Sequence, residues 1–357
     1  FLFIIHVLSL FSKSNKMNMF DQTLEKLLSG ESLSYQEAYS AMISIMNGDI
    51  PPSRLAAWLT LLKVKGENAD EISGCAAAMR EKSIKIRCNN PNAVDTCGTG
   101  GDNLGTFNVS TAAAIIASGA GLTVAKHGNR AVSGKCGSAD VLEKLGIDIR
   151  MPKEKAEKCL NQLGIVFLFA PDFHPAMKFA SPVRRELGFR TIFNILGPLS
   201  NPALVKKGVI GVYSKKLCKI IAEAAAKIGY EDLIVVHSED GLDEISLSAP
   251  TLICEIRNGE FLEYEFNPIH HGFNFVSIDI FSGTSPEENA ELILQILNPK
   301  LPDSPQRQIS IINAAAAIFA SNKTKNWDEA INAASLSISS GAALKKLEDW
   351  KKFSESN

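Results

Sequence analysis

The sequence predicts an α/β protein, with a small all-helical N-terminal domain followed by a larger α/β domain whose sheet is mostly parallel with an antiparallel edge. Three observations support this fold class. Helix signals alone fill the chain from residue 20 to residue 87. After Pro91, short apolar runs alternate with helices, which is typical of parallel strands joined by right-handed crossovers. Asn258-Gly259 separates two later apolar runs, as in a β-hairpin at a sheet edge.

The N-terminal helices are marked by their ends. Ser34 and Glu37 have the spacing of a capping box, in which each side chain accepts the backbone N–H of the other residue. A proline near the start and a glycine at the end bound the third helix. The predicted helices cover residues 21–28, 34–47, 52–66 and 69–83. Nothing in this helical unit carries obvious chemistry.

Strands and helices alternate in the next part of the chain. The predicted strands cover residues 93–95, 122–125, 164–170, 208–213 and 233–237. The predicted helices between them cover residues 110–118, 138–145 and 215–228. Residues 252–257 and 261–266 are expected to pair as the hairpin, and helices follow from Pro286 to Trp350. Residues 184–202 lie between two strands but have the pattern of a crossing helix and turn, so we expect them to return to the N-terminal helices.

The domain organisation follows from these elements. We expect a helical domain over residues 17–88, completed by residues of about 175–200, and an α/β domain over residues 89–174 and 201–357. Residues 1–16 are expected to be an upstream extension outside the native protein. Their apolar run has no preceding methionine or basic residue and no small-residue cleavage site. An extra packing helix and an export signal are the second and third interpretations.

Composition and charge narrow the function classes. The chain has 357 residues, of which 45% are hydrophobic and 21% charged, as in an ordinary soluble globular protein. A formal net charge of −2 gives no global attraction to nucleic acid or to an anionic membrane, so neither is expected as a partner. The seven cysteines are scattered without a Cys-x-x-Cys pair. This argues against a disulfide framework or a zinc site and favours a cytoplasmic location.

The first candidate binding element is the glycine-rich turn Gly98-Thr-Gly-Gly-Asp102. It is not a dinucleotide fingerprint, since Asn103 stands where a glycine is required, and Gly105 is not followed by the lysine of a Walker loop. Three glycines in four residues still let backbone N–H groups approach a ligand closely. The next predicted helix begins near Asn108-Val-Ser-Thr111, whose open amides and hydroxyls suit a phosphate. The alternative is a sharp turn without a ligand.

A second candidate element, Lys126-His-Gly-Asn-Arg130, follows the next predicted strand. It should emerge at the same sheet edge as the glycine turn, where ligands of open α/β sheets bind. Lys126, His127 and Arg130 are expected to supply positive charge there, and lysine and arginine suit phosphate oxygens. A solvated basic loop is the alternative. Ser138, at the next helix start, supplies another hydroxyl or simply caps that helix.

An acidic loop follows the last predicted parallel strand. Residues 237–244 contain four acids, of which Asp243 and Glu244 are adjacent. Adjacent carboxylates at a strand exit suit Mg²⁺, which takes few protein oxygens together with substrate phosphates and water. A solvated acidic loop is the alternative, but metal binding is favoured opposite a phosphate cradle.

Two further candidates remain open on spacing alone. His174 stands before a proline, where a histidine is more often structural than catalytic. Arg184 either pairs with nearby Glu186 or binds a substrate carboxylate through its two parallel N–H groups.

Taken together, these motifs resemble the anthranilate phosphoribosyltransferase family of tryptophan biosynthesis. The resemblance rests on Gly98-Thr-Gly-Gly-Asp, Asn108-Val-Ser-Thr, Lys126-His-Gly-Asn-Arg, Gly137-Ser-Ala-Asp-Val-Leu-Glu, His174-Pro-Ala-Met-Lys and Arg184-Arg-Glu-Leu-Gly-Phe-Arg-Thr-Ile-Phe-Asn. It extends from about Asp21 to the C-terminal helices. It implies a homodimeric, Mg²⁺-dependent enzyme that joins the amine of anthranilate to C1 of phosphoribosyl pyrophosphate and releases diphosphate.

The resemblance also implies a role for individual residues. Phosphoribosyl pyrophosphate is expected to contact Gly98, Gly101, Asp102, Thr106, Asn108, Val109, Ser110, Thr111, Lys126, His127, Gly128, Asn129, Arg130, Ala131, Val132, Ser133, Gly134 and Ser138. Anthranilate is expected to contact Gly98, Asn129, His174 and Arg184. The metal is expected at Ser110, Asp243 and Glu244, and the catalytic residues are expected to be Lys126 and Ser110.

One departure from the family pattern and two rival functions bear on this interpretation. Gly134 and Cys136 stand where the family pattern has serines, so a backbone amide or water must replace a hydroxyl, with some loss of affinity. A pyrimidine nucleoside phosphorylase would need no acidic metal pair, and Asp243-Glu244 argues against it. A non-catalytic relative that binds nucleic acid would need a broad basic groove, which a slightly acidic chain does not favour.

Overall fold

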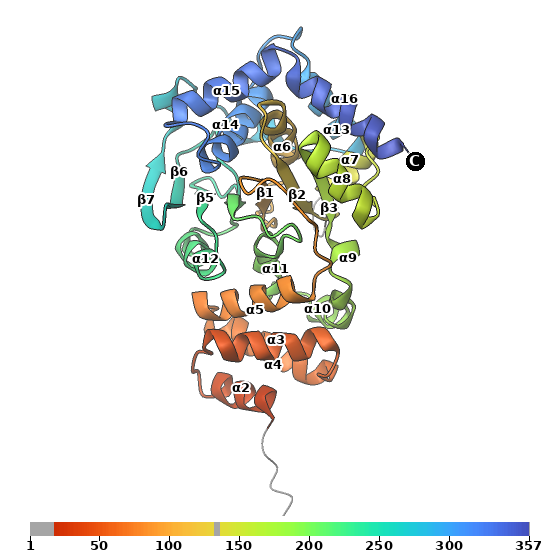
Figure 1. The fold of residues 1–357 in the computed structure, drawn as a ribbon. Helices are drawn as coiled ribbons and strands as arrows, with labels where there is room; N and C mark the ends of the chain where they lie inside the picture. The colour runs from red at the N-terminus through yellow and green to blue at the C-terminus, as the bar shows by residue number, and fades with distance from the viewer. Residues whose placement is uncertain (1–17, 132–135, 357) are drawn as a thin grey trace, which may run out of the picture.

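Helices alone build the N-terminal end of the molecule, at the bottom of Figure 1. The computed structural model describes residues 18–131 and 136–356, so the expectation for residues 1–16 lies outside the described residues. The N-terminal helices are α2 (Met19–Leu28), α3 (Tyr35–Asn47), α4 (Pro52–Lys65) and α5 (Ala69–Lys82). Each agrees with its predicted range to within two residues at either end.

The predicted capping box at the start of α3 is confirmed. The Ser34 hydroxyl accepts the Glu37 N–H at 3.3 Å, and the Glu37 carboxylate accepts the Ser34 N–H at 2.9 Å. A second capping box, formed by Asn68 and Glu71, opens α5. These bonds satisfy amides that a helix start leaves without a partner, which is why the local sequence marks the helix boundaries so well.

The chain returns to the helical unit after the third strand. The returning segment contains α10 (Ser181–Leu187), α11 (Phe193–Leu196) and the 3₁₀ turn η2 (Pro198–Ser200). It packs against α4 and α5, and the apolar core that joins these helices continues onto one face of the sheet. Arg80 of α5 also donates hydrogen bonds to the carbonyls of Leu199 at 2.7 Å and Ile228 at 3.0 Å.

The sheet has the strand order β3-β2-β1-β4-β5-β6-β7 in the part of the chain that is described. Its strands are β1 (Val94–Gly98), β2 (Val124–Gly128), β3 (Ile165–Phe169), β4 (Lys207–Gly211), β5 (Asp232–Ser238), β6 (Thr251–Arg257) and β7 (Glu260–Phe266). Strands β1 to β5 run parallel, whereas β6 and β7 pair antiparallel. Asn258 and Gly259 form the hairpin turn with φ of 52° and 80°. The mostly parallel sheet with an antiparallel edge is therefore confirmed.

Strands β1 and β2 are longer at their carboxyl ends than the sequence predicts. They end at Gly98 and Gly128, whereas the predicted strands end at residues 95 and 125. Glycine and charged residues have low strand propensity, but both strands lie inside the sheet with a partner on each side. Tertiary pairing therefore overrides local propensity, and Lys126 and His127 lie within β2 rather than in a loop after it.

Helices cover both faces of the sheet (Figure 1). One face is packed by α6 (Val109–Gly119) and by the C-terminal helices. The opposite face is packed by α12 (Lys215–Lys227) and the helical unit. The remaining helices are α7 (Ser138–Lys144), α8 (Lys153–Leu163), α9 (Ala170–Phe173), α13 (Pro286–Leu297), α14 (Pro305–Ala320), α15 (Trp327–Ser339) and α16 (Ala342–Glu355). Short 3₁₀ turns are η1 (Pro175–Phe179), η3 (Pro268–His271) and η4 (Ile278–Phe281). No helix of the described residues is long and apolar enough to span a membrane.

Candidate active site

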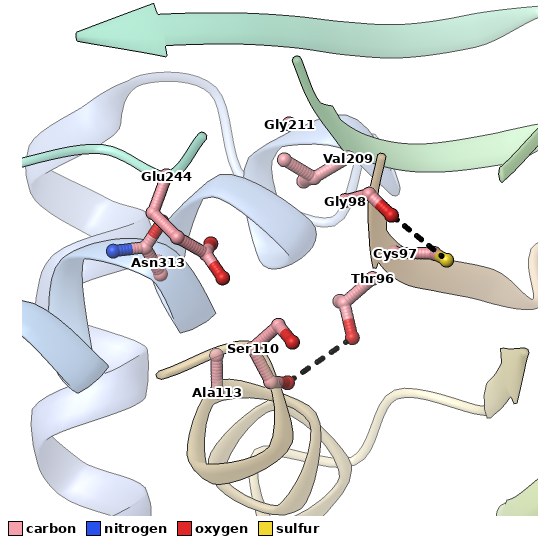
Figure 2. A pocket seen from close by; sticks show the side chains of 9 residues that line it. All are labelled: Thr96, Cys97, Gly98, Ser110, Ala113, Val209, Gly211, Glu244 and Asn313. Carbon is pink, nitrogen blue, oxygen red and sulfur yellow. Dashed lines mark hydrogen bonds between the residues drawn. The ribbon is translucent and has the colours of Figure 1, made fainter. Parts of the chain in front are cut away.

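A cavity opens at the carboxyl ends of the central strands (Figure 2). It is lined by Thr96, Cys97, Gly98, Ser110, Ala113, Val209, Gly211, Glu244 and Asn313. These residues come from β1, β4, α6, α14 and the loop after β5, so segments far apart in the sequence meet here. The carboxyl edge of a parallel sheet is where such folds bind their ligands.

Lys126 and the start of α6 form the positive side of this region. The Lys126 ammonium donates to the Thr96 carbonyl at 2.5 Å and to the Ser110 hydroxyl at 3.1 Å, and its side chain is almost fully buried. Helix α6 has no side-chain hydrogen bond capping its first turn. Its start therefore adds the partial positive charge of a helix N-terminus beside the ammonium, which favours an anion.

Asp243 and Glu244 form the negative side. The Asp243 carboxylate accepts the Gly100 N–H at 2.8 Å. A Cβ atom on Gly98 would lie 2.7 Å from this carboxylate, and one on Gly211 would lie 1.6 Å from the Asp243 carbonyl. Glycines at both positions are thus required for the acidic loop to approach the strand ends so closely.

The electrostatics of the acidic pair fit a divalent cation. Burial raises the pKa of the Asp243 carboxyl, and the neighbouring Asp102 carboxylate raises it further. Burial likewise raises the pKa of Glu244, with Asp243 as the second cause. A cation would offset both the lost hydration and the repulsion. Within the described residues no group of three or more acidic, histidine or cysteine side chains encloses a metal by itself. Mg²⁺ does not require a third protein side chain, because it takes its remaining ligands from water and substrate phosphates.

His127 does not supply the positive charge that the sequence predicts. Side chains alternate along a strand, so Lys126 and His127 point to opposite faces of β2. The Nδ1 atom of the His127 ring lies 3.1 Å from the Gly197 carbonyl oxygen. The backbone N–H of His127 donates to the buried Asp95 carboxylate at 3.1 Å. Burial lowers the pKa of His127 to about 3, with a smaller contribution from His174, so its ring is neutral at pH 7.

His174 lies next to His127, with the two ring centroids 5.1 Å apart. Burial lowers its pKa to about 4. The Nε2 atoms of both rings are buried and have no hydrogen-bond partner among the described residues. The structure therefore brings two neutral imidazoles together behind β2, a pairing that their separation in the sequence does not reveal.

Arg130 is less free than the sequence suggests. Its guanidinium bonds to the Asp140 carboxylate at 2.7 Å and to the two Glu143 oxygens at 2.6 and 2.8 Å. These bonds, that to Glu143 first, raise the pKa of Arg130. A phosphate group would have to compete with two carboxylates for this side chain. Its phosphate-binding role stays a prediction, and its backbone N–H is itself accepted by the Asn129 side chain.

Asn108, which precedes α6, forms hydrogen bonds with Cys136, a residue that follows the Lys126–Arg130 element. Its side-chain carbonyl accepts the Cys136 thiol at 3.2 Å and the Asn289 amide at 3.3 Å, and its amide donates to the Cys136 carbonyl at 3.1 Å. Cys136, which replaces an expected serine, is therefore held at the start of α6. The predictions for Val132, Ser133 and Gly134 lie outside the described residues.

The other residues predicted to contact the phosphoribosyl group differ in which of their atoms a ligand could reach. Val109 and Thr111 are fully buried, so a ligand at the start of α6 would reach their backbone rather than their side chains. Thr106 pairs with Ser282 in an isolated bridge beside α6. A Cβ atom on Gly128 would lie 2.4 Å from the Ser138 hydroxyl, so glycine allows that close approach.

Two arginines lie on the returning segment, and one of them contacts the glycine-rich turn. Arg184 lies over the Phe193 ring at 5.1 Å, and within the described residues it has no carboxylate partner, not even nearby Glu186. Arg190, which sequence reasoning missed, donates to the Gly101 carbonyl and lies 4.2 Å from the Tyr213 ring centroid. Its position in the same motif as Arg184 is the signal that was available for it.

Comparisons with known proteins give the class of protein first. Residues 21–83 match a family model described as glycosyl transferase family, helical bundle domain. Residues 90–344 match the model of the glycosyl transferase family, a/b domain. The two models thus follow one another along the chain in the order of its helical and α/β parts.

Similar proteins then narrow the class. The chain is 45% identical over 335 residues to the anthranilate phosphoribosyltransferase of Pelotomaculum thermopropionicum, which covers 94% of this chain and 96% of that protein. The crystal structure of the Thermus thermophilus enzyme matches with a TM-score of 0.89 and 39% identity over 94% of this chain and 99% of that one. The Saccharomyces cerevisiae enzyme, solved with PRPP and Mg, matches with a TM-score of 0.86 and 31% identity over 96% and 99%. The chain therefore belongs to the anthranilate phosphoribosyltransferase family.

Proposed function

We propose that this chain transfers the phosphoribosyl group of phosphoribosyl pyrophosphate to the amine of anthranilate in tryptophan biosynthesis. The products are N-(5-phosphoribosyl)anthranilate and diphosphate. The observation that carries the proposal is the meeting of opposite charges around Ser110. Lys126 donates to its hydroxyl, and Glu244 lies across the same cavity. The substrates follow from membership of the family.

The chemistry assigns the main work to the leaving group. The amine of anthranilate is neutral and nucleophilic at pH 7, so no strong base is required. Breaking the bond from C1 to the diphosphate oxygen builds positive charge on the ribose and negative charge on diphosphate. Lys126 and the positive end of α6 would stabilise the leaving oxygens, and holding both substrates in line would supply the remainder.

The metal site is proposed at Asp243 and Glu244, with the Ser110 hydroxyl nearby. A bound Mg²⁺ would supply positive charge to the diphosphate oxygens. The residues present fit this group because Glu244 lines the cavity together with Ser110, and the adjacent Asp243 carboxylate lies against Gly98, which also lines it. Gly100 contributes by fixing one Asp243 oxygen with its backbone N–H.

Anthranilate is proposed to bind between the strand ends and the returning segment. Gly98, Asn129 and His174 would line its path, and Arg184 would bind its carboxylate. A guanidinium that lies on an aromatic ring and has no acidic partner in the described part of the chain is suited to this task, because no ion pair seen there must first be broken.

Replacing Arg184 by alanine should raise KM for anthranilate selectively. Loss of a charge-assisted hydrogen bond predicts roughly a 10- to 100-fold increase, with KM for phosphoribosyl pyrophosphate nearly unchanged. Steady-state kinetics with each substrate varied in turn would measure both. The exposed neighbour Arg185 gives a matched control, Arg185→Ala, which should leave both values close to wild type. A loss confined to the phosphoribosyl donor would contradict the assignment.

Assembly, location and domain limits are further parts of the proposal. We expect a homodimer in the cytoplasm, with no nucleic acid or membrane partner. The helical domain is proposed over residues 17–88, completed by about 175–200, and the α/β domain over 89–174 and 201–357. The packing of α10 and α11 against α4 and α5 supports the inclusion of the returning segment in the helical domain.

The activity is tested by following anthranilate fluorescence. Purified protein mixed with anthranilate, phosphoribosyl pyrophosphate and Mg²⁺ should consume the fluorescent amine, and excess EDTA should abolish this loss. Restoration by added Mg²⁺ would tie the effect to the metal. No loss from folded protein freed of residues 1–16 would contradict the proposed reaction and direct attention to Gly134 and Cys136.

A further inference from the structure

Asn313 is a polar side chain buried within an apolar helix. It lies in α14, its residue is 3% exposed, and its neighbours Ile312 and Ala314 are fully buried. Burying a side-chain amide in such surroundings is unfavourable unless its hydrogen bonds are satisfied. The bonds that Asn313 makes therefore account for its place in the helix.

The Asn313 amide holds one residue of the acidic loop by its backbone. Its carbonyl oxygen accepts the Ile245 N–H at 2.9 Å, and its amide group donates to the Ile245 carbonyl at 2.8 Å. A third bond, to the Ile309 carbonyl at 2.9 Å, ties the side chain to its own helix. Both backbone groups of Ile245 are thus fixed by a side chain that cannot easily rotate.

Ile245 directly follows the acidic pair. The Asp243 carboxylate accepts the Gly100 N–H at 2.8 Å, which ties it to the glycine-rich turn after β1. Glu244 lies between these two attachments, and Figure 2 shows it beside Asn313 at the cavity edge. The pair is therefore fastened at both ends, by the glycine turn after β1 and by α14.

Holding the backbone on both sides of Glu244 keeps the acidic side chains close together. Asp102, Asp243 and Glu244 repel one another when charged, and a loop free to move would let the carboxylates separate and regain water. A side chain that fixes the backbone prevents this and leaves the oxygens preorganised for a cation. Groups that orient metal ligands in this way typically change metal affinity 10- to 100-fold when removed.

We propose that Asn313 is a positioning residue for the cation site, because it fixes Ile245 and so holds the Asp243-Glu244 pair at the cavity lined by Ser110. This inference rests on the proposed function, since it concerns the same metal-dependent site. Asn313 itself touches no substrate in this role and acts only through the acidic loop.

The test measures metal binding without turnover. Mn²⁺ serves as the probe, and its free concentration is followed by electron paramagnetic resonance in the presence of phosphoribosyl pyrophosphate and absence of anthranilate. Asn313→Ala is expected to raise the apparent Kd for Mn²⁺ about 10-fold or more. In the activity assay, excess Mg²⁺ should recover much of the lost kcat/KM, and KM for anthranilate should stay near the wild-type value.

Two control variants separate positioning from general damage. Ser310→Ala removes a buried hydroxyl one turn earlier on α14. Among the described residues this hydroxyl bonds only to the Gln306 carbonyl of its own helix. Ser246→Ala removes bonds to Asp240 and Ser248 within the same loop, beyond Ile245. Both variants should lower stability while keeping the Mn²⁺ affinity of the wild type.

Asn313→Ser covers the case in which the alanine variant does not fold. Serine can bond to the carbonyl four residues earlier, as Ser310 does, but cannot reach Ile245. It should fold and show the same loss of Mn²⁺ affinity. Wild-type affinity in a folded Asn313 variant, or an equal loss in Ser246→Ala, would overturn the proposal. A wild-type protein that converts anthranilate but binds no Mn²⁺ would overturn it too, whereas failure of the proposed function would appear as absent turnover.

Discussion

Replacing Lys126 by alanine should lower kcat/KM for phosphoribosyl pyrophosphate by about 10² to 10³, the loss typical of a preorganised donor to a developing anion. The Lys126 ammonium is buried in β2 and already bonded to Ser110 at the start of α6. Its positive charge therefore acts in a place of low dielectric, where it stabilises the departing diphosphate more than it would in water. KM for anthranilate should change little.

Comparison variants make this result specific. Lys126→Arg keeps the charge but spreads it over a planar group that does not fit the Thr96 and Ser110 contacts, so partial activity is expected. Lys144→Ala removes an exposed lysine of α7 whose partner is Glu287, and should behave as the wild type. Thermal unfolding should confirm that each variant is folded. Wild-type kinetics in Lys126→Ala would remove Lys126 from the mechanism.

Features set by neighbouring residues could be predicted from the sequence. The Ser34 capping box and the Asn258-Gly259 hairpin are present because each depends on residues that are close along the chain. The approach of the glycine-rich turn to the acidic loop could also be predicted, although without its detailed contacts, because parallel strands bring their carboxyl ends to one edge of the sheet.

The direction in which a side chain points, and whether it is charged, were harder to predict from the sequence. The predicted strand ended before Lys126, so nothing indicated that Lys126 and His127 point to opposite faces of β2. Once His127 lies behind the sheet, burial among the returning segment removes its charge. The sequence carries the residue type, whereas its protonation depends on the medium that distant segments create around it.

Contacts between residues far apart in the sequence were the hardest to predict. Asn313 and Ile245 are 68 positions apart, and an asparagine in an alanine-rich helix has no pattern that names its partner. Arg130 likewise appeared free, because Asp140 and Glu143 face it only after α7 folds back beside the basic motif. Helix α8 was missed for a different reason, since only Ala156, Cys159 and Leu160 of its eleven residues are buried and its apolar stripe is short.

The buried histidines behind β2 should make the folded state lose stability as pH falls. An unfolded histidine takes up a proton near pH 6.5, whereas burial holds the pKa of His127 at about 3. Between these values the unfolded chain binds more protons, so the His127 contribution to the free energy of unfolding decreases as pH falls below 6.5. Its size is about 2 kcal/mol between pH 7 and pH 5. Burial raises the pKa of Asp95 to about 6, so the Asp95 contribution to the free energy of unfolding increases as pH falls. The His127 contribution must therefore be measured as the difference between the wild type and a variant without this histidine.

That difference is obtained with His127→Asn, which can still donate to the Gly197 carbonyl but does not titrate. Urea unfolding of both proteins from pH 7 to pH 5 should show the wild type losing about 2 kcal/mol relative to the variant. His270→Asn, on the surface, removes a histidine without disturbing the buried pair and serves as the control. A constant difference between the wild type and His127→Asn across this range would mean that His127 is charged or hydrated in the folded protein, and that its ring does not share a dry site with His174.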